Sequence, residues 1–241
     1  MKIDRLYTFW TGENDIPEKR KECLNSMINS GLNVVLINNK NIGEYLDLDS
    51  LHPAYFKLNL AHRADYLRAY FMHHYGGAYS DIKKINESWV PACERLSQSE
   101  KLYACGYAEI NRHNVGNIYQ STMLRKDSKL NVNFSYIKWR WLQLNYKKTI
   151  GNCAFVFKPY SPITEAWWVE LNRRLDVLLP ELEEFSAGYP KERIGHFYDG
   201  VISKYPVPWT FILGDILQPL TLKYTAYVLK ELPLPLFINY Q

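Results

Sequence analysis

The chain has 241 residues, of which 47% are hydrophobic and 22% charged, so it can bury one large core without the help of a metal or a disulfide. Its formal net charge of +4 is too small to indicate a nucleic-acid-binding protein, and we expect no nucleic-acid partner. No apolar run is long enough to cross a bilayer, and the opening residues, MKIDRLYTFW, lack a secretory signal. We therefore expect a cytoplasmic protein, with the inner face of the cell membrane as one place where it could act.

The four cysteines are widely spaced, which argues against a zinc ribbon or a redox pair. We expect them to be reduced and mostly buried thiols. Aromatic residues make up 15% of the chain, more than a core needs, and this content suits a surface that stacks on sugar rings or bases.

The first third of the chain predicts alternating strands and helices. Residues 5–10, RLYTFW, alternate like a half-buried strand, and a helix is expected from Pro17 to Gly31. Residues 33–38, NVVLIN, have the continuous apolar pattern of a fully buried strand.

The strongest predicted helix runs from about residue 58 to residue 75. Its apolar residues recur at spacings of four, three and four on one face, and they are Leu60, Ala64, Leu67 and Phe71. Gly76 and Gly77 should end it, because glycine accepts the left-handed conformation that a helix C-terminus requires.

A third strand, residues 78–82 or AYSDI, follows the glycine pair. This alternation predicts an α/β fold with a mainly parallel sheet and helices on both faces. In such a sheet, ligands collect at the carboxyl ends of the strands. Trp10 and Asp81 both fall at those ends.

The rest of the chain gives weaker signals. Residues 101–107 and 152–157 are strand candidates, and an amphipathic helix is expected from Pro162 through Leu175. A final helix is expected from Leu220 to Leu232, ended by Pro233. Residues 110–150 should form a mostly helical insertion over the site, within a single domain.

Two charged residues three apart, Asp65 and Arg68, lie at the edge of the apolar face of the long helix. Such a pair is most often a surface ion pair worth about 0.3 to 0.5 kcal/mol. The adjacent glycine turn and Asp81 favour a functional role instead.

Together, Asp65, Arg68, the glycine pair, Tyr79 and Asp81 resemble the signature of GT-A glycosyltransferases of the sugar-binding-region (DXD-containing) and capsular polysaccharide synthesis types. The opening FWTGENDIP also resembles the start of these enzymes. The resemblance covers roughly the first 90 residues. It implies a GT-A, Rossmann-like fold with a nucleotide-sugar-binding half, residues 1–110, and a partly helical acceptor-side half, residues 111–241.

The resemblance further implies transfer of a sugar from a nucleotide-sugar, with a UDP-sugar favoured, to a hydroxyl of an oligosaccharide or lipid-linked glycan acceptor. Transfer with retention, in surface polysaccharide biosynthesis, is what it suggests. The residues that it assigns to the donor sugar and its phosphates are Asp65, Arg68, Tyr79 and Asp81. The residues that it places around the donor base and at the later strand are Trp10, Thr11, Gly12 and Asn152.

The sequence departs from the family pattern at Lys83, which stands where the second acid of a DXD motif should be. We expect the Lys83 ammonium to replace part of the field of the metal ion, provided that Asp81 and Lys83 lie on the same side of the strand. The plainer interpretation is that Lys83 only solvates the end of a loop. Mn²⁺ or Mg²⁺ held by Asp81 and waters is the other alternative, and such a metal could be dispensable.

Loss of the second acid also leaves open a different class of function. The chain could be a non-catalytic nucleotide-sugar or glycan-binding module that has kept the fold. Asp199 and Asp215 are weaker candidates for an acceptor base, since capping or helix-surface roles suit them better.

Residues 133–148, NFSYIKWRWLQLNYKK, interleave basic and aromatic side chains. Phe134, Ile137, Trp141 and Leu144 recur at spacings of three and four, which predicts an amphipathic helix with a buried stripe. The alternative is a basic and aromatic face that makes peripheral contact with anionic lipid or a phosphate-linked glycolipid acceptor.

Overall fold

The computed structural model describes residues 2–237. In that part of the chain the main sheet has six strands in the order β2-β1-β3-β5-β4-β8, and β5 alone runs against the others. The strands are β1 (Arg5–Trp10), β2 (Asn33–Asn38), β3 (Gly77–Ser80), β4 (Ala104–Ala108), β5 (Ile150–Phe157) and β8 (Val228–Leu229). A separate hairpin consists of β6 (Phe197–Tyr198) and β7 (Val201–Ile202). The predicted α/β class with a mainly parallel sheet is confirmed.

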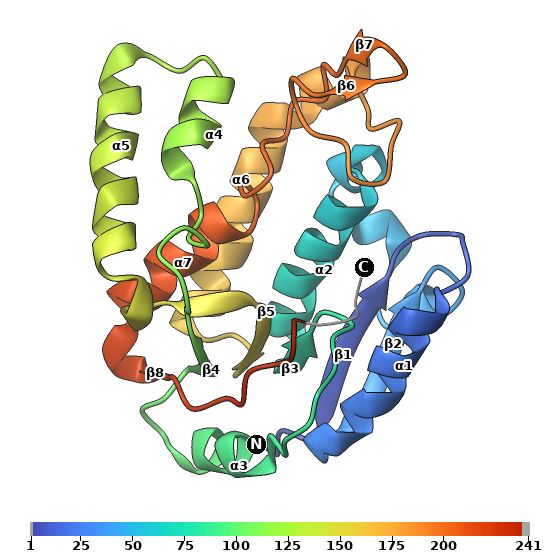
Figure 1. Ribbon diagram of the computed structural model, residues 1–241, viewed down its shortest axis with the longest axis vertical. Helices are drawn as coiled ribbons and strands as arrows, with labels where there is room; N and C mark the ends of the chain where they lie inside the picture. The colour runs from blue at the N-terminus through green and yellow to red at the C-terminus, as the bar shows by residue number, and fades with distance from the viewer. Residues whose placement is uncertain (1, 238–241) are drawn as a thin grey trace.

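Helices pack against both faces of the sheet (Figure 1). They are α1 (Glu18–Ser26), α2 (Leu60–His74), α3 (Val90–Gln98), α4 (Ile118–Leu124), α5 (Lys129–Leu144), α6 (Pro162–Glu184) and α7 (Gly214–Lys223). Along β1, Tyr7 and Phe9 point into the larger core with α2 and α6, whereas Leu6 joins the smaller core with α3. This alternation follows from the two-residue period of a strand.

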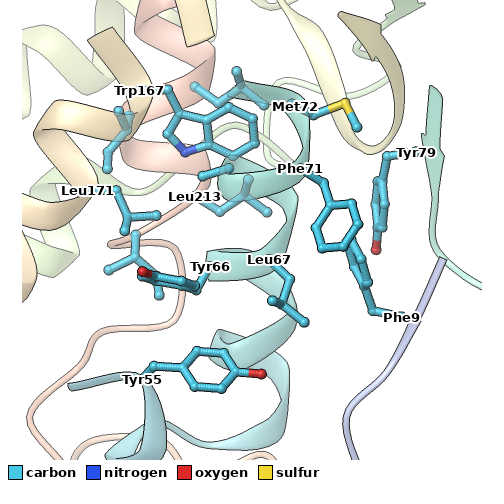
Figure 2. Packing of buried hydrophobic residues seen from close by; sticks show 14 of the residues in the cluster. Phe9, Tyr55, Tyr66, Leu67, Phe71, Met72, Tyr79, Trp167, Leu171 and Leu213 are labelled. Atoms are coloured by element: carbon cyan, nitrogen blue, oxygen red, sulfur yellow. The ribbon is translucent and has the colours of Figure 1, made fainter. Parts of the chain in front are cut away.

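The larger core is rich in aromatic side chains, which fix α2 against the sheet. The rings of Phe9 and Tyr79 stack with their centroids 5.3 Å apart, and Phe71 of α2 lies 5.2 Å from Phe9 (Figure 2). On the far side of α2, Trp167 and Leu171 of α6 complete the packing. Helix α2 is therefore held rigidly between the sheet and α6.

The end of α2 follows the predicted glycine turn. Gly76 and Gly77 have φ angles of +64° and +97°, which are values that other residues rarely adopt. A Cβ atom at Gly76 would also lie 2.4 Å from the Cδ atom of Pro159. Only glycine fits here, and the turn sends the chain directly from α2 into β3.

Three local predictions are wrong. Strand β2 is only partly buried because it is an edge strand, and Ile37 is its one fully buried residue. Helix α6 continues to Glu184, beyond the predicted end at Leu175. The last helix begins at Gly214 and ends at Lys223, and the segment predicted to be its second half instead forms β8 beside β4.

The connection from β4 to β5 contains α4 and α5, which pack side by side at one edge of the molecule (Figure 1). The predicted buried stripe of this region is wrong. Phe134, Ile137, Trp141 and Leu144 are all exposed, while Leu142 and Gln143 face the protein. The apolar spacing located the helix correctly but not its buried side.

Candidate functional site

Three side chains converge on one carboxylate, Asp81, just beyond the end of β3, and a fourth, Asp65, contacts one of the three. Its Oδ1 atom accepts hydrogen bonds from Arg68 Nη2 at 2.8 Å and from Tyr79 Oη at 2.7 Å. Its Oδ2 atom accepts one from Lys83 Nζ at 2.5 Å. Arg68 Nη1 also lies 3.2 Å from Asp65 Oδ1. We call these five residues the Asp81 cluster.

The Asp65–Arg68 pair is not an ordinary surface pair. Asp65 is only 8% exposed, and the Arg68 guanidinium lies 4.6 Å from the centroid of the Tyr79 ring. Arg68 therefore links three elements. Within α2 it contacts Asp65, and on β3 it contacts the ring of Tyr79. It also donates a hydrogen bond of 3.2 Å to the backbone carbonyl oxygen of Asn152 on β5.

Lys83 likewise does not lie in solvent, since it is 5% exposed. Its ammonium is 2.5 Å from Asp81 and 5.1 Å from the centroid of the Phe237 ring. The interpretation that Lys83 only solvates a loop end is wrong. The side chains of Asp81 and Lys83 lie on the same side of the backbone, as strand alternation predicted, although β3 itself ends at Ser80.

Sheet topology explains why Asn152 reaches this cluster. Because β5 is antiparallel to β3, its beginning lies at the edge where the parallel strands end. Ser80 pairs with Ala154, and the next residue, Asp81, donates its backbone N–H to the carbonyl oxygen of Cys153 at 2.8 Å. The residues before Ala154 therefore lie beside the Asp81 cluster.

The two carboxyl groups of the cluster have opposite pKa shifts. Burial alone would raise the pKa of Asp81, but the Lys83 ammonium and the Arg68 guanidinium hold it well below its usual range. For Asp65 burial dominates and raises the pKa to about 6, with Arg68 opposing the shift and Asp81 adding to it. Asp81 is thus a permanent anion, and Asp65 titrates close to neutral pH.

A divalent metal fits this arrangement poorly. Both Asp81 oxygens already accept hydrogen bonds from Arg68, Tyr79 and Lys83. Within residues 2–237, no group of three or more histidine, cysteine or acidic side chains could hold a metal ion. The cationic partners of Asp81 are side chains of the protein itself.

Two polar atoms next to the cluster are buried without a hydrogen-bond partner in the described part of the chain. They are Nε of Arg68, a donor, and Oδ1 of Asn152, an acceptor. A hydroxyl group can accept from the first and donate to the second. Each atom is chemically suited to a sugar hydroxyl or a water, and because both are buried a ligand would reach them only after a side-chain shift.

Trp10 and Gly12 line a cavity of about 300 Å³ at the carboxyl ends of β1 and β2, together with residues 13–16 and 38–40. Tyr7 of β1 pairs with Tyr79 of β3 in parallel, so the carboxyl ends of the two strands lie side by side. The cavity at the end of β1 therefore lies at the same edge of the sheet as Asp81. The Trp10 Nε1 atom donates to the carbonyl oxygen of Asn14 at 2.7 Å, which fixes the indole at the cavity wall.

Thr11 lies next to this cavity but its hydroxyl has another partner. It donates to the carbonyl oxygen of Leu60, at the start of α2, at a distance of 2.8 Å. Thr11 thus joins the end of β1 to the helix that carries Asp65 and Arg68. The geometry gives Thr11 a positioning contact.

Sequence reasoning missed several polar residues at the same edge of the sheet. Glu109, which follows β4, is buried and lies 3.3 Å from Nε2 of Gln218 on α7. Tyr107 of β4 shares a hydrogen bond of 2.7 Å with the Cys153 thiol. An acid two residues after the predicted strand 101–107 was the available signal for Glu109.

A second cavity, of about 380 Å³, lies between α4 and α6 and has Asp215 in its wall. Burial raises the pKa of Asp215, whose Oδ2 atom has no hydrogen-bond partner among the described residues. The arginines in the same wall already bind acids, Arg125 to Glu181 and Arg174 to Glu170. Asp199, the other candidate base, is exposed in the turn of the β6–β7 hairpin.

The fold and the site together define an α/β protein with a buried ionic cluster at the carboxyl edge of its sheet. Residues 1–82 match the family model described as capsular polysaccharide synthesis protein, so the chain is similar to that family over about its first third. The match ends immediately after Asp81. No curated protein and no solved structure matches the chain.

The similarity fits a role in capsular polysaccharide synthesis. The four cysteines are free thiols, three of them buried. Within the described residues, every helix is too short or too polar to span a bilayer.

Proposed function

We propose that this protein is a glycosyltransferase of the GT-A type, which moves a sugar from a nucleotide-sugar to a glycan or glycolipid hydroxyl. The observation that supports the proposal is the convergence of Arg68, Tyr79 and Lys83 on Asp81. Asp65 completes the arrangement through its ion pair with Arg68. Asp65 and Arg68 lie on α2, Tyr79 lies on β3, and Asp81 and Lys83 follow β3 directly. All of them except Lys83 fall within the residues that are similar to capsular polysaccharide synthesis proteins.

The location of the cluster supports a donor site. It lies at the carboxyl edge of a mainly parallel sheet, where ligands of α/β proteins bind. The Trp10 cavity at the same edge is lined by an indole on which a nucleobase can stack. Asp65 and Arg68 would then hydrogen-bond the sugar, and Asn152 and Arg68 offer the unpaired acceptor and donor for its hydroxyls.

The charges of the cluster support a metal-free version of the DXD arrangement. Two carboxylates and one divalent cation have no net charge, and neither do one carboxylate and one ammonium group. Asp81 and Lys83, 2.5 Å apart, therefore balance charge in the same way without a metal. A UDP-sugar is the favoured donor, and Mn²⁺ or Mg²⁺ would be dispensable.

In the reaction, the bond between the anomeric carbon and the diphosphate oxygen breaks, and a bond to the acceptor hydroxyl oxygen forms. The hydroxyl proton passes to the leaving diphosphate, which can act as the base in transfer with retention. Lys83 and Arg68, held in place by Asp81, would stabilise the charge that grows on the diphosphate.

Replacing Lys83 tests this assignment most directly. At an effective dielectric constant near 20, two unit charges about 4 Å apart interact by about 4 kcal/mol, so loss of the ammonium should lower turnover at least about a hundredfold. We expect this result for Lys83→Met, with partial recovery in Lys83→Arg. Melting curves of each variant verify that the protein still folds.

The reverse experiment restores the second acid. Lys83→Asp recreates two carboxylates around residue 82, so we expect little activity in EDTA and a gain on adding Mn²⁺. The wild-type enzyme should respond to neither. Lys84→Asp is the matched control, since Lys84 is the exposed neighbour and should change little.

The alternative function is a non-catalytic nucleotide-sugar or glycan-binding module. It is favoured by the fact that both Asp81 oxygens are already bound by the protein's own side chains. A panel of uridine, guanosine and cytidine sugar nucleotides, with and without Mn²⁺, separates the two functions. A thermal shift with slow nucleotide release indicates the transferase, and a shift without release indicates the module. No shift with any donor would contradict both.

A further inference from the structure

Helix α5 has its apolar side turned away from the protein. Five large apolar residues on it are 59% to 74% exposed, and they are Leu130, Phe134, Ile137, Trp141 and Leu144. Their spacings of four, three, four and three place them within about 80° of arc on one side of the helix. We call this set the α5 stripe.

The opposite side of α5 attaches the helix firmly to the protein. Ser135, Leu142 and Gln143 are buried there, and α5 packs against α4 and α7. Tyr119 of α4 forms ring contacts with Tyr136 and Trp139, at centroid distances of 5.2 Å and 5.9 Å. The α5 stripe is therefore presented on a rigid support.

The charges on α5 and on the turn that follows it are all of one sign, and the nearest acidic residue in the sequence is Asp127, just before the helix. Residues 128–149 include five basic residues and no acidic residue. At 100° per residue, Lys138 flanks one edge of the stripe and Arg140 the other. A second copy of this chain would bring these like charges together, whereas an anionic surface would neutralise them.

A cavity of about 390 Å³ lies between α5 and α7, beside Trp141 of the stripe. Its wall has three lysines, Lys138, Lys148 and Lys223, and apolar groups from Pro219 and Leu222. Ammonium groups next to an apolar wall match a phosphate head group whose acyl chain continues along the protein. The cavity thus points to the same occupant as the stripe.

We propose that the α5 stripe and this lysine-lined cavity form a docking surface for an anionic phospholipid membrane. The helix would lie flat, with the stripe between the head groups and the basic residues at phosphate level. Such a surface needs no membrane-spanning helix. The inference is independent of the proposed transfer reaction, because it uses none of the residues of the Asp81 cluster.

Vesicle sedimentation with the full chain tests the proposal. We expect binding to vesicles of equal parts phosphatidylglycerol and phosphatidylcholine, and much weaker binding to phosphatidylcholine alone. Binding should fall as salt is raised, because the lysine contribution is screened. Inorganic phosphate should not compete with the vesicles at millimolar concentration, since a free anion cannot replace the burial of the stripe in the membrane.

Matched variants locate the surface. Phe134→Ser with Trp141→Ser should lower the partition coefficient at least about tenfold, because burial of each aromatic ring contributes a large share of the binding free energy. The control is Phe197→Ser on the β6–β7 hairpin, a phenylalanine that is 71% exposed against 65% for Phe134. It should bind as the wild type does.

Charge variants test the second component. Lys138→Glu with Lys148→Glu should weaken binding several-fold or more, and Lys191→Glu, an exposed lysine far along the sequence, should have little effect. These positions are at the surface, so melting temperatures should be unchanged.

Three results would overturn the proposal. The first is failure to bind anionic vesicles. The second is an equal loss of binding in Phe197→Ser and in the α5 variants. The third is a dimer in sedimentation velocity that Phe134→Ser converts to a monomer, without any vesicle binding, because the stripe would then be an interface between two copies.

Discussion

Helices α2 and α5 have almost the same apolar pattern but opposite orientations. In α2 the residues spaced four, three and four apart end in Leu67 and Phe71, which are fully buried between the sheet and α6. In α5 the equivalent spacing, from Leu130 to Trp141, faces outward. Apolar periodicity therefore identifies the apolar face of a helix but does not identify what covers that face.

Composition distinguishes the two helices better than periodicity. Helix α2 has Asp65 as well as basic residues, and its charges pair with one another and with Asp81. Helix α5 has only basic charges. An apolar stripe flanked by charges of a single sign indicates an external partner of the opposite sign.

The largest expected difference between the two helices is the effect on stability of removing one phenylalanine ring from each. Phe71→Ala leaves a cavity in the aromatic core and should lower the free energy of unfolding by about 3 to 5 kcal/mol. Phe134→Ala should change it by less than about 0.5 kcal/mol, because the ring is exposed. Urea unfolding measures both, and similar losses would show that the α5 stripe is buried in solution.

The helix N-termini give the next comparison. Asn59 caps α2 by accepting from the His62 N–H at 2.7 Å and also donates to the carbonyl oxygen of Glu192 at 2.8 Å, both in the interior. Ser128 caps α5 at the surface, accepting from Asn131 N–H at 3.3 Å. We expect Asn59→Ala to cost about 2 kcal/mol and Ser128→Ala about 0.5 kcal/mol. Equal losses would contradict this difference in burial.

The smallest effect is the pH dependence that Asp65 gives to α2. Its pKa of about 6 in the folded protein is above the ordinary value of 3.8, so the unfolded state binds fewer protons and stability falls as the pH rises. Between pH 5 and 7.5 this amounts to roughly 1 to 1.5 kcal/mol.

Asp65→Asn should remove that dependence. The unfolding free energy of the wild type should fall relative to the variant across this range, as measured by urea unfolding at several pH values. A constant difference between them would mean that the pKa of Asp65 is ordinary. Glu184→Gln, at the surface end of α6, is a control that should show no such trend.

The sequence predicted well what depends on neighbouring residues. The strand-helix-strand opening, the glycine turn and the meeting of Asp81 with Lys83 all follow from local spacing and were confirmed. Arg68 also contacts both Asp65 and Asp81, and the tight turn between α2 and β3 brings these residues together. Their role in binding a donor stays a prediction.

Contacts between distant segments were harder to predict. The segment from Tyr224 to Leu232 has helical propensity, but pairing of β8 with the edge of β4 prevails over it. Glu109 and Gln218 meet across more than a hundred residues, and no local pattern joins them. The burial of Lys83 also depends partly on Phe237, near the other end of the chain.

One feature of the sheet has a consequence for how this protein could diversify. Strands β4 and β5 are antiparallel neighbours, with Ala108 directly opposite Ile150, so a tight turn would be enough to connect them. Residues 109–149, which include α4 and α5, therefore form an insertion between two strands that a simple hairpin turn could connect. Relatives could carry a different insertion here, and with it a different docking surface, while the Asp81 cluster stays the same.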